Sequence, residues 1–200
     1  MGEALNRLDT DLFLRLNGLY AGWLDPIMVL ATERNTWIPL YILLIAWLVR
    51  LYRKQAVGMI LSLVAAVALS DQTASALLKP LTLRLRPCHE PGLKNLLHPV
   101  LECGGTYGFA SSHAANSFAL AMGLWLLLGR RFPSLRWAFA WAGLVSYSRI
   151  YVGAHYPLDV LAGAGVGVLM ATVSVTVFRW LGRSLKNRQA GNTATNTRHR

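Results

Sequence analysis

Apolar residues in this chain gather into five long runs, with polar residues concentrated between them. The runs lie at about residues 36–51, 55–78, 113–128, 135–151 and 157–181. Such runs are typical of helices that cross a lipid bilayer, since a span takes about 20 predominantly apolar residues. The pattern therefore predicts an all-α fold, an integral membrane helical bundle with about five transmembrane helices.

The N-terminal segment has a different pattern, in which leucines are mixed with charged residues. Asp25 then opens a second short helix that we expect to reach about Thr32, because a proline follows it. We expect residues 1–35 to form amphipathic helices that lie on the membrane surface. The alternative is a sixth span through residues 12–32, although Arg15 and Asp25 would be costly in lipid.

The formal net charge is +11, which raises the question of a nucleic-acid partner. The cations follow the apolar runs directly: Arg50, Arg53, Lys54, Arg130, Arg131, Arg136, Arg179, Arg183, Lys186, Arg188, Arg198 and Arg200. This is the positive-inside pattern of cytoplasmic loops, whereas nucleic-acid binding calls for a stripe on one face. We therefore expect a bilayer partner, a transmembrane domain over 36–183, and a basic, disordered cytoplasmic tail over 184–200.

Three polar segments fall on the opposite, extracytoplasmic face if the basic clusters are cytoplasmic. They are Lys79 with the loop 80–110, the start of the third run at His113, and the stretch Ser148–Asp159. Segments that are distant in the sequence thus converge at one membrane level. That convergence predicts a functional site facing the exterior.

Both cysteines, Cys88 and Cys103, lie in the outer loop. An oxidising compartment permits a disulfide between them. The bridge would close a loop of about 16 residues and contribute roughly 3 kcal/mol in the chain-entropy model. The alternatives are two unpaired thiols, or a metal site completed by His89 and His98, although this spacing matches no common type of metal site.

His155 and Asp159 are four residues apart, so they share one face of a helical turn if Pro157 opens a helix. The carboxylate can then accept one imidazole N–H, fix the tautomer and leave the other nitrogen free to attack. Arg149 offers a planar fork for phosphate oxygens. The plainer interpretation is that Asp159 caps a helix and His155 is an ordinary turn residue.

Cleavage of a phosphate ester spreads negative charge over the equatorial oxygens, so preorganised cations are the main catalytic resource. Lys79 and Arg86 supply two more in addition to Arg149. Ser111 lies where a helix N-cap is expected, so its hydroxyl and the N–H groups after it, beginning with Ser112, can face an anion.

The two histidines would complete the chemistry of a phosphatase. His155 would attack phosphorus to give a phosphohistidine, and His113 would protonate the departing oxygen and then activate water. The cations would replace a metal, so the sequence predicts no cofactor.

The ordered pattern is K-x6-R-P from Lys79, S-x-H from Ser111, and S-R-x5-H-x3-D from Ser148. It resembles the three signature motifs of the type 2 phosphatidic acid phosphatase superfamily of membrane lipid phosphatases. The resemblance implies the same residue roles. The second motif departs from the usual Pro-Ser-Gly-His, because Ser112 puts a side chain where glycine would let the backbone approach phosphate.

The resemblance is strongest to small bacterial undecaprenyl-diphosphate and phosphatidylglycerophosphate phosphatases of the inner membrane. It implies hydrolysis of a lipid phosphate or diphosphate, with undecaprenyl diphosphate as the first choice. The alternatives are a phosphatidylglycerophosphate, phosphatidic acid or lipid A phosphatase. A non-hydrolytic lipid-phosphate transporter or scaffold is the alternative of another class, and the oligomeric state is left open.

Two charged residues stay outside this scheme. Asp71 lies within the second apolar run, where an unpaired carboxylate is expensive, so we expect it to pair with a basic residue. Arg84 lies in the outer loop, where we expect it to be solvated.

Overall fold

The computed structural model describes residues 2–98 and 100–198, with side chains of the C-terminal stretch described up to Ser184. Within these residues the fold is all-helical, as predicted. Its α-helices are α1 (Gly2–Asn17), α2 (Asp25–Thr32), α3 (Ile38–Tyr52), α4 (Lys54–Gln72), α5 (Lys79–Thr82), α6 (Ser112–Leu128), α7 (Trp137–Tyr151) and α8 (Pro157–Arg198). Short 3-10 turns occur at Arg34–Trp37, Pro87–His89 and Pro133–Arg136, and a π-helical segment at Thr73–Leu78 joins α4 to α5.

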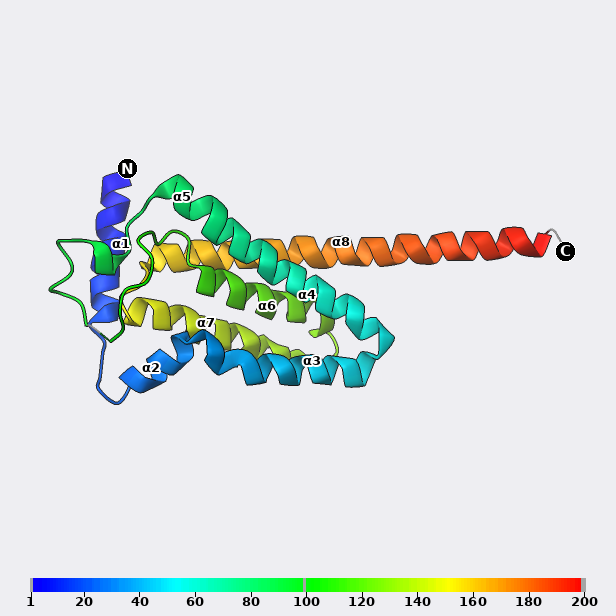
Figure 1. Ribbon diagram of the computed structural model, residues 1–200, viewed down its shortest axis with the longest axis horizontal. Helices are drawn as coiled ribbons and strands as arrows, with labels where there is room; N and C mark the ends of the chain where they lie inside the picture. The colour runs from blue at the N-terminus through cyan, green and yellow to red at the C-terminus, as the bar shows by residue number, and fades with distance from the viewer. Residues whose placement is uncertain (1, 99, 199–200) are drawn as a thin grey trace.

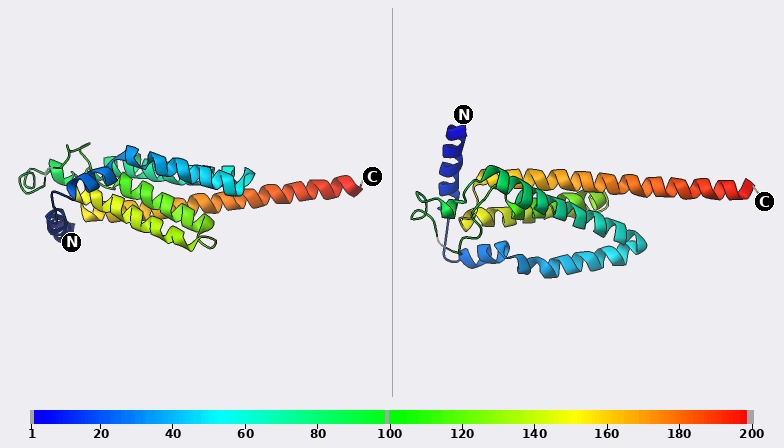
Figure 2. Two further views of the ribbon diagram at one scale, coloured as in Figure 1. Left: turned by 90° about the horizontal axis from the view of Figure 1, so that it is seen from below. Right: turned by 45° about the horizontal axis from the view of Figure 1, so that its top comes forward.

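Helices α3, α4, α6, α7 and α8 run side by side along the long axis of the molecule (Figures 1 and 2). The α3–α4 and α6–α7 turns lie at one end of this bundle, and these turns carry Arg53 and Arg130. Helices α1 and α2 and the loop between α5 and α6 lie at the other end, where α1 crosses the bundle axis (Figure 1). The polar segments therefore gather at one end, as the charge pattern predicts.

Three stretches of the described chain are long and apolar enough to cross a membrane: Arg34–Tyr52, Lys54–Thr82 and Pro157–Ser184. Their outer surfaces carry exposed apolar side chains such as Leu43, Val57 and Leu161, as expected of helices in lipid. Helix α6 is apolar but has 17 residues, and α7 has 15. The protein is thus a membrane protein with several apolar helices, and crossing by all five stays a prediction.

The N-terminal segment forms the two helices that were expected, whereas the C-terminal end differs from expectation. The N-terminal segment forms two helices separated by a turn, so the alternative of one span through residues 12–32 is wrong. At the C-terminus α8 continues as a helix to Arg198, where the sequence predicts a disordered tail. Lys186, Arg188 and Ala190 are good helix formers and no proline interrupts the helix, but residues 191–197 are mostly Gly, Asn and Thr, so helix propensity does not explain its last two turns. Residues 199 and 200 lie outside the described part.

Helices α6 and α8 approach each other backbone to backbone. A Cβ atom on Gly163 would lie 2.3 Å from the carbonyl oxygen of Ser111, and one on Gly167 would lie 2.2 Å from that of Ala115. Small residues at such a spacing let two membrane helices pack closely. The backbone N–H of Ser111 also donates to the carbonyl of Asp159 at 2.9 Å. The start of α6 and the first turn of α8 are therefore fixed to each other.

We predict that Gly167→Ala destabilises the protein by about 1–3 kcal/mol, the usual cost of overpacking a close contact. Gly165→Ala is the matched control, because it lies on the same helix with nothing within 4 Å of the added Cβ. The measurement is thermal unfolding of both variants in one detergent. Equal melting temperatures for the two variants would contradict the close packing.

Candidate active site

A cavity of about 720 Å³ lies between α3, α4, α6 and α7. Its polar end is lined by Lys79, Arg86, Ser112, His113 and His155. Apolar side chains line the remainder, including Leu44, Leu48, Leu63 and Val145. Five of the residues predicted from the sequence thus meet at one end of a cavity with an apolar body.

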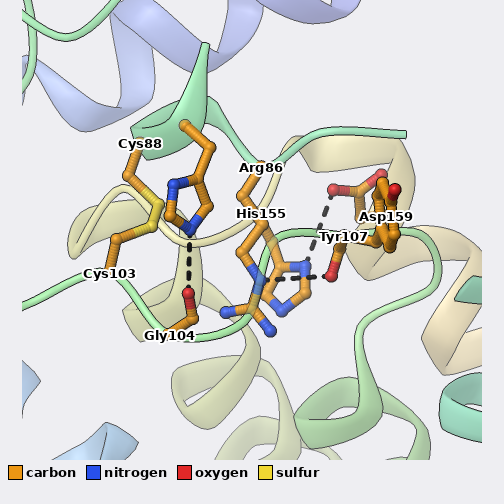
Figure 3. The surroundings of a disulfide bond; sticks show 8 residues. Arg86, Cys88, Cys103, Gly104, Tyr107, His155 and Asp159 are labelled. Carbon is orange, nitrogen blue, oxygen red and sulfur yellow. Dashed lines mark hydrogen bonds and ion pairs between the residues drawn. A yellow bond between two sulfur atoms is a disulfide. The ribbon is translucent and has the colours of Figure 1, made fainter. Parts of the chain in front are cut away.

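His155 and Asp159 are both buried, with exposed fractions of 1% and 0%. Pro157 begins α8, so Asp159 lies in its first turn as predicted. The imidazole Nδ1 faces the carboxylate Oδ2 at 3.6 Å, and Figure 3 shows the two side chains together. The same Oδ2 accepts the backbone N–H of Tyr156 at 3.0 Å. Asp159 therefore lies behind His155, where it can orient the ring.

The turn between α7 and α8 is shaped to present His155. The backbone N–H groups of Ala154 and His155 both donate to the carbonyl of Arg149, at 2.9 and 3.2 Å. Gly153 adopts a φ of +74°, in the left-handed region that glycine accepts without strain. This geometry ends α7 and reverses the chain before α8 starts.

Burial lowers the pKa of the His155 imidazole well below its usual 6.5, and nearby cations, Arg86 first, lower it further. A lowered pKa means that the neutral ring persists to more acidic pH. Among the described residues Nδ1 has no hydrogen-bond partner, because 3.6 Å to Asp159 Oδ2 exceeds hydrogen-bond distance. If Nδ1 carries the proton and directs it toward Asp159, Nε2 is available as a nucleophile.

The hydroxyl of Ser112 holds Lys79, and Ser112 stands where the second motif usually has glycine. Lys79 Nζ donates to Ser112 Oγ at 2.9 Å, and Ser75 Oγ lies 2.8 Å from the same oxygen. Ser75 belongs to the π-helical segment directly before Lys79, and such segments are frequent at functional sites. Ser112 therefore fixes the position of the lysine ammonium group.

Arg86 is buried at the base of the outer loop. Its backbone N–H donates to the carbonyl of Thr106 at 3.1 Å, and its Nε donates to the carbonyl of Tyr107 at 3.2 Å. Pro87 follows it, and Cys88 is joined to Cys103 in a disulfide (Figure 3). These contacts tie the two sides of the loop together and hold the Arg86 guanidinium at the cavity.

The four residues of the alternative metal site, Cys88, His89, His98 and Cys103, do not all come together in the structure. Cys88, His89 and Cys103 lie together, but the disulfide uses both sulfur atoms. His89 Nε2 bonds the carbonyl of Gly104 at 2.8 Å. His98 lies apart from this group, and its Nε2 contacts the Asp25 carboxylate at 3.0 Å.

Arg149 and Ser111 support the site from outside the cavity lining. Arg149 Nη1 donates to Thr32 Oγ1, which ties the end of α2 to α7. Its Nε is buried with no hydrogen-bond partner among the described residues.

Ser111 is the N-cap of α6, as predicted, and its Oγ accepts the N–H of Ala114 at 3.5 Å. Its side chain is fully buried, so the start of α6 presents Ser112 and His113 to the cavity.

Two charged residues behave differently from the sequence-based expectation. Asp71 lines the cavity, and its Oδ1 accepts a hydrogen bond at 3.0 Å from Asn116 Nδ2 rather than from a basic residue. Arg84 is not a solvated loop residue, because it forms ion pairs with Asp159 and Asp9 at 2.8 and 2.6 Å. Sequence spacing gave no signal for either contact, since each joins elements far apart in the chain.

We predict that His155 is neutral at pH 6.5, with its protonation midpoint below that value. The measurement is the ¹⁵N NMR spectrum of histidine-labelled protein in lipid nanodiscs between pH 8 and pH 5. His155→Ala assigns the resonance by its disappearance. A cationic His155 at pH 6.5 would contradict the effect of burial.

We predict that Ser112→Ala lowers kcat/KM for phosphate release about tenfold, because a hydrogen bond to a charged group is worth about 1.5 kcal/mol. Thr172→Ala is the control, since it also removes a hydroxyl from a helix, on an exposed part of α8 that bonds only its own turn. Activity of Ser112→Ala equal to that of the control would show that Lys79 does not need this anchor.

Comparison with known proteins places these observations in a family. The model of the PAP2 superfamily matches residues 55–183, more than half of the chain. A lipid A 4′-phosphatase from Bacteroides thetaiotaomicron is 36% identical, over 84% of this chain and 75% of that protein. A lipid A 4′-phosphatase from Porphyromonas gingivalis is 34% identical, over 91% of this chain and 80% of that protein.

Two further relatives agree with this family. An undecaprenyl-diphosphatase from Sulfolobus acidocaldarius is 30% identical, over 88% of this chain and 81% of that protein. The crystal structure of LpxE from Aquifex aeolicus superposes with a TM-score of 0.67 at 25% identity, and the match covers 84% of this chain and 95% of that one. The resemblance seen in the three motifs is confirmed, and so is the prediction of an enzyme. The chain belongs to the PAP2 superfamily and is a membrane lipid phosphatase.

Proposed function

We propose that this protein removes a phosphate group from lipid A or a closely similar phosphorylated glycolipid, through a phosphohistidine on His155. The observation that carries the substrate is the pair of relatives named for lipid A 4′-phosphatase activity, at 36% and 34% identity over most of the chain. They support this choice better than undecaprenyl diphosphate, the first choice from the sequence.

The cavity supports an amphiphilic substrate. Its polar end holds the candidate catalytic groups, and its body between α3, α4, α6 and α7 is apolar. A phosphate bound at the polar end would place the lipid portion of the substrate against apolar side chains or the surrounding bilayer. Acyl chains that pass from the bilayer into this cavity stay in apolar surroundings, so their apolar surface is not exposed to water.

Lys79 and Arg86 line the polar end of the cavity and would bind the phosphate directly, and Arg149, which lies outside the lining, would add a third positive charge close by. The hydrogen bonds that fix them go to neutral oxygens, from Lys79 to Ser112, from Arg86 to Tyr107 and from Arg149 to Thr32. Their positive charges are therefore available to the equatorial oxygens as negative charge develops there. The chain thus supplies by itself the charge that a metal ion supplies in other phosphatases.

The two histidines would divide the transfer into two steps. His155 Nε2 attacks phosphorus and the P–O bond to the lipid breaks, while His113 donates a proton to the departing oxygen. His113 then takes a proton from water, whose oxygen attacks the phosphohistidine and releases inorganic phosphate. Asp159 stabilises the positive charge that His155 gains in the first step.

The membrane orientation is part of the proposal. The α3–α4 and α6–α7 turns lie at the end of the bundle opposite the starts of α6 and α8 (Figure 1). Arg53 and Arg130 belong to these turns, and the cavity-lining residues His113 and His155 belong to the opposite end. By the positive-inside rule those turns are cytoplasmic. The active site then faces the periplasm or exterior of a bacterial inner membrane, and the C-terminus is cytoplasmic.

A second candidate substrate is undecaprenyl diphosphate, which the Sulfolobus acidocaldarius relative favours. The same residues would act, with a lipid monophosphate as the leaving group instead of a lipid alcohol. The polar end of the cavity would then have to accept two adjacent phosphate groups.

We predict that the purified protein, in detergent with EDTA, releases phosphate from lipid A faster than from undecaprenyl diphosphate, phosphatidylglycerophosphate or phosphatidic acid. His155→Ala should lower the rate at least about 10³-fold while the melting temperature is retained, because the nucleophile itself is lost. The readout is inorganic phosphate per protein over time.

The panel also defines the results that contradict the proposal. Preference for undecaprenyl diphosphate would move the assignment to the second candidate. Full activity of folded His155→Ala would remove the phosphohistidine, and release that requires a divalent metal would contradict catalysis by the protein's own cations.

A further inference from the structure

We propose that helix α1 is a positioning element of the active site, acting through an ion-pair relay from Asp9 through Arg84 to Asp159. The inference rests on the proposed roles of His155 and Asp159. It adds two positioning residues. Asp9 lies outside the three signature motifs, and Arg84 occupies one of the unspecified x positions of the first motif, K-x6-R-P.

The Arg84 guanidinium joins two buried carboxylates. Its Nη1 lies 2.8 Å from Asp159 Oδ1, and its Nη2 lies 2.6 Å from Asp9 Oδ2. The side chain of Asp9 is 1% exposed and that of Asp159 is 0% exposed. The guanidinium also stacks 4.2 Å from the centre of the Tyr156 ring. Arg84 is therefore fixed on three sides.

This contact decides which carboxylate oxygen faces the nucleophile. Arg84 occupies Asp159 Oδ1, which leaves Oδ2 for the N–H of Tyr156 and for His155 Nδ1. Rotation of the carboxylate would break the ion pair with Arg84. An Nδ1–H directed at one defined oxygen 3.6 Å away would keep a single tautomer, and misplacement of a reacting group by about 1 Å can cost about 10²-fold in rate.

Asp9 supplies charge as well as position. Its Oδ1 accepts the N–H of Leu158 at 2.9 Å, so it caps the first turn of α8 directly before Asp159. The negative charge of Asp9 offsets part of the positive charge of Arg84. The guanidinium therefore does not fully neutralise the carboxylate of Asp159. Asp159 can then stabilise the positive charge that develops on His155, and such effects are strong where water is excluded.

The whole buried face of α1 contacts the segment that carries His155. Phe13 packs edge-on against Tyr156, with ring centres 5.4 Å apart. Asn17 Nδ2 donates to the carbonyls of Ile150 and Tyr151 at 3.1 and 2.7 Å. Asp9, Phe13 and Asn17 are spaced by four, so one stripe of α1 makes all these contacts.

Arg84 and Asp9 act through Asp159 rather than on the substrate. Arg86 lines the cavity, and Arg84 instead points to the far side of Asp159. Loss of the relay should therefore lower kcat and leave KM nearly unchanged, whereas loss of a phosphate contact should raise KM as well.

The test compares Arg84→Ala, Arg84→Lys and Asp9→Asn with Asp11→Asn, using phosphate release from lipid A in detergent. Asp11 is an exposed carboxylate on the same helix, so Asp11→Asn is the matched control for the same chemical change. We expect kcat to fall about 10²-fold in Arg84→Ala and about tenfold in Asp9→Asn, with KM within about twofold of wild type. Arg84→Lys should recover part of the loss, and the control should equal wild type.

The outcomes separate this inference from the proposed function. Wild-type kcat in folded Asp9→Asn and Arg84→Ala, with inactive His155→Ala, overturns the relay and leaves the phosphohistidine standing. Raised KM with unchanged kcat also overturns it, because the residues would then contact substrate. If His155→Ala is active, the proposed function fails and the relay falls with it. Asp9→Asn, which keeps the shape and the contact to Leu158, decides the matter if Arg84→Ala does not fold.

Discussion

The buried carboxylate of Asp159 is the constraint on which the rest of this structure depends. A charge with no exposed surface inside an apolar bundle is costly unless ion pairs and hydrogen bonds compensate it. Arg84 and the N–H of Tyr156 provide these contacts, and the close approach of α6 and α8 at Gly163 and Gly167 fixes the helix that carries it. The outer loop, α1 and the first turn of α8 are therefore all arranged around one side chain that faces His155.

Burial would also strengthen the effect of the cationic end of the cavity on a bound phosphate. Coulombic interactions are several times stronger in a protein interior than in water, so cations held by neutral acceptors act strongly on a bound phosphate. The structure places Lys79 and Arg86 at the polar end of a cavity whose body is apolar. Charge recognition and lipid recognition thus occupy opposite ends of a single cavity, which is what a phosphatase for an amphiphile requires.

Much of the fold and of the catalytic centre could be predicted from the sequence. The apolar runs predicted the helices of the bundle, because hydrophobicity dictates membrane helices directly. The helix start at Pro157 and the proximity of His155 and Asp159 were also predicted, although His155 precedes the helix instead of sharing its first turn with Asp159. The contacts of Arg84, Asp9 and Asp71 could not be predicted in this way. Each joins segments separated by 45 residues or more, and a charged residue in an amphipathic helix or a polar loop has the same local pattern whether it is solvated or paired. Asp9, Phe13 and Asn17 have the spacing of a buried helix face. Two of the three are polar, so the sequence pattern did not identify this face of α1 as buried.

Covalent phosphorylation of His155 is the central claim of this account, and trapping the intermediate tests it most directly. The protein would be mixed with lipid A labelled with ³²P in its phosphate groups and quenched in alkali within milliseconds, since phosphohistidine survives alkali and is lost in acid. Covalent phosphorylation of His155 predicts a labelled protein whose label maps to the peptide containing His155 and is absent from His155→Ala. Rapid release of phosphate with no labelled protein at any time, or label on another residue, would contradict it.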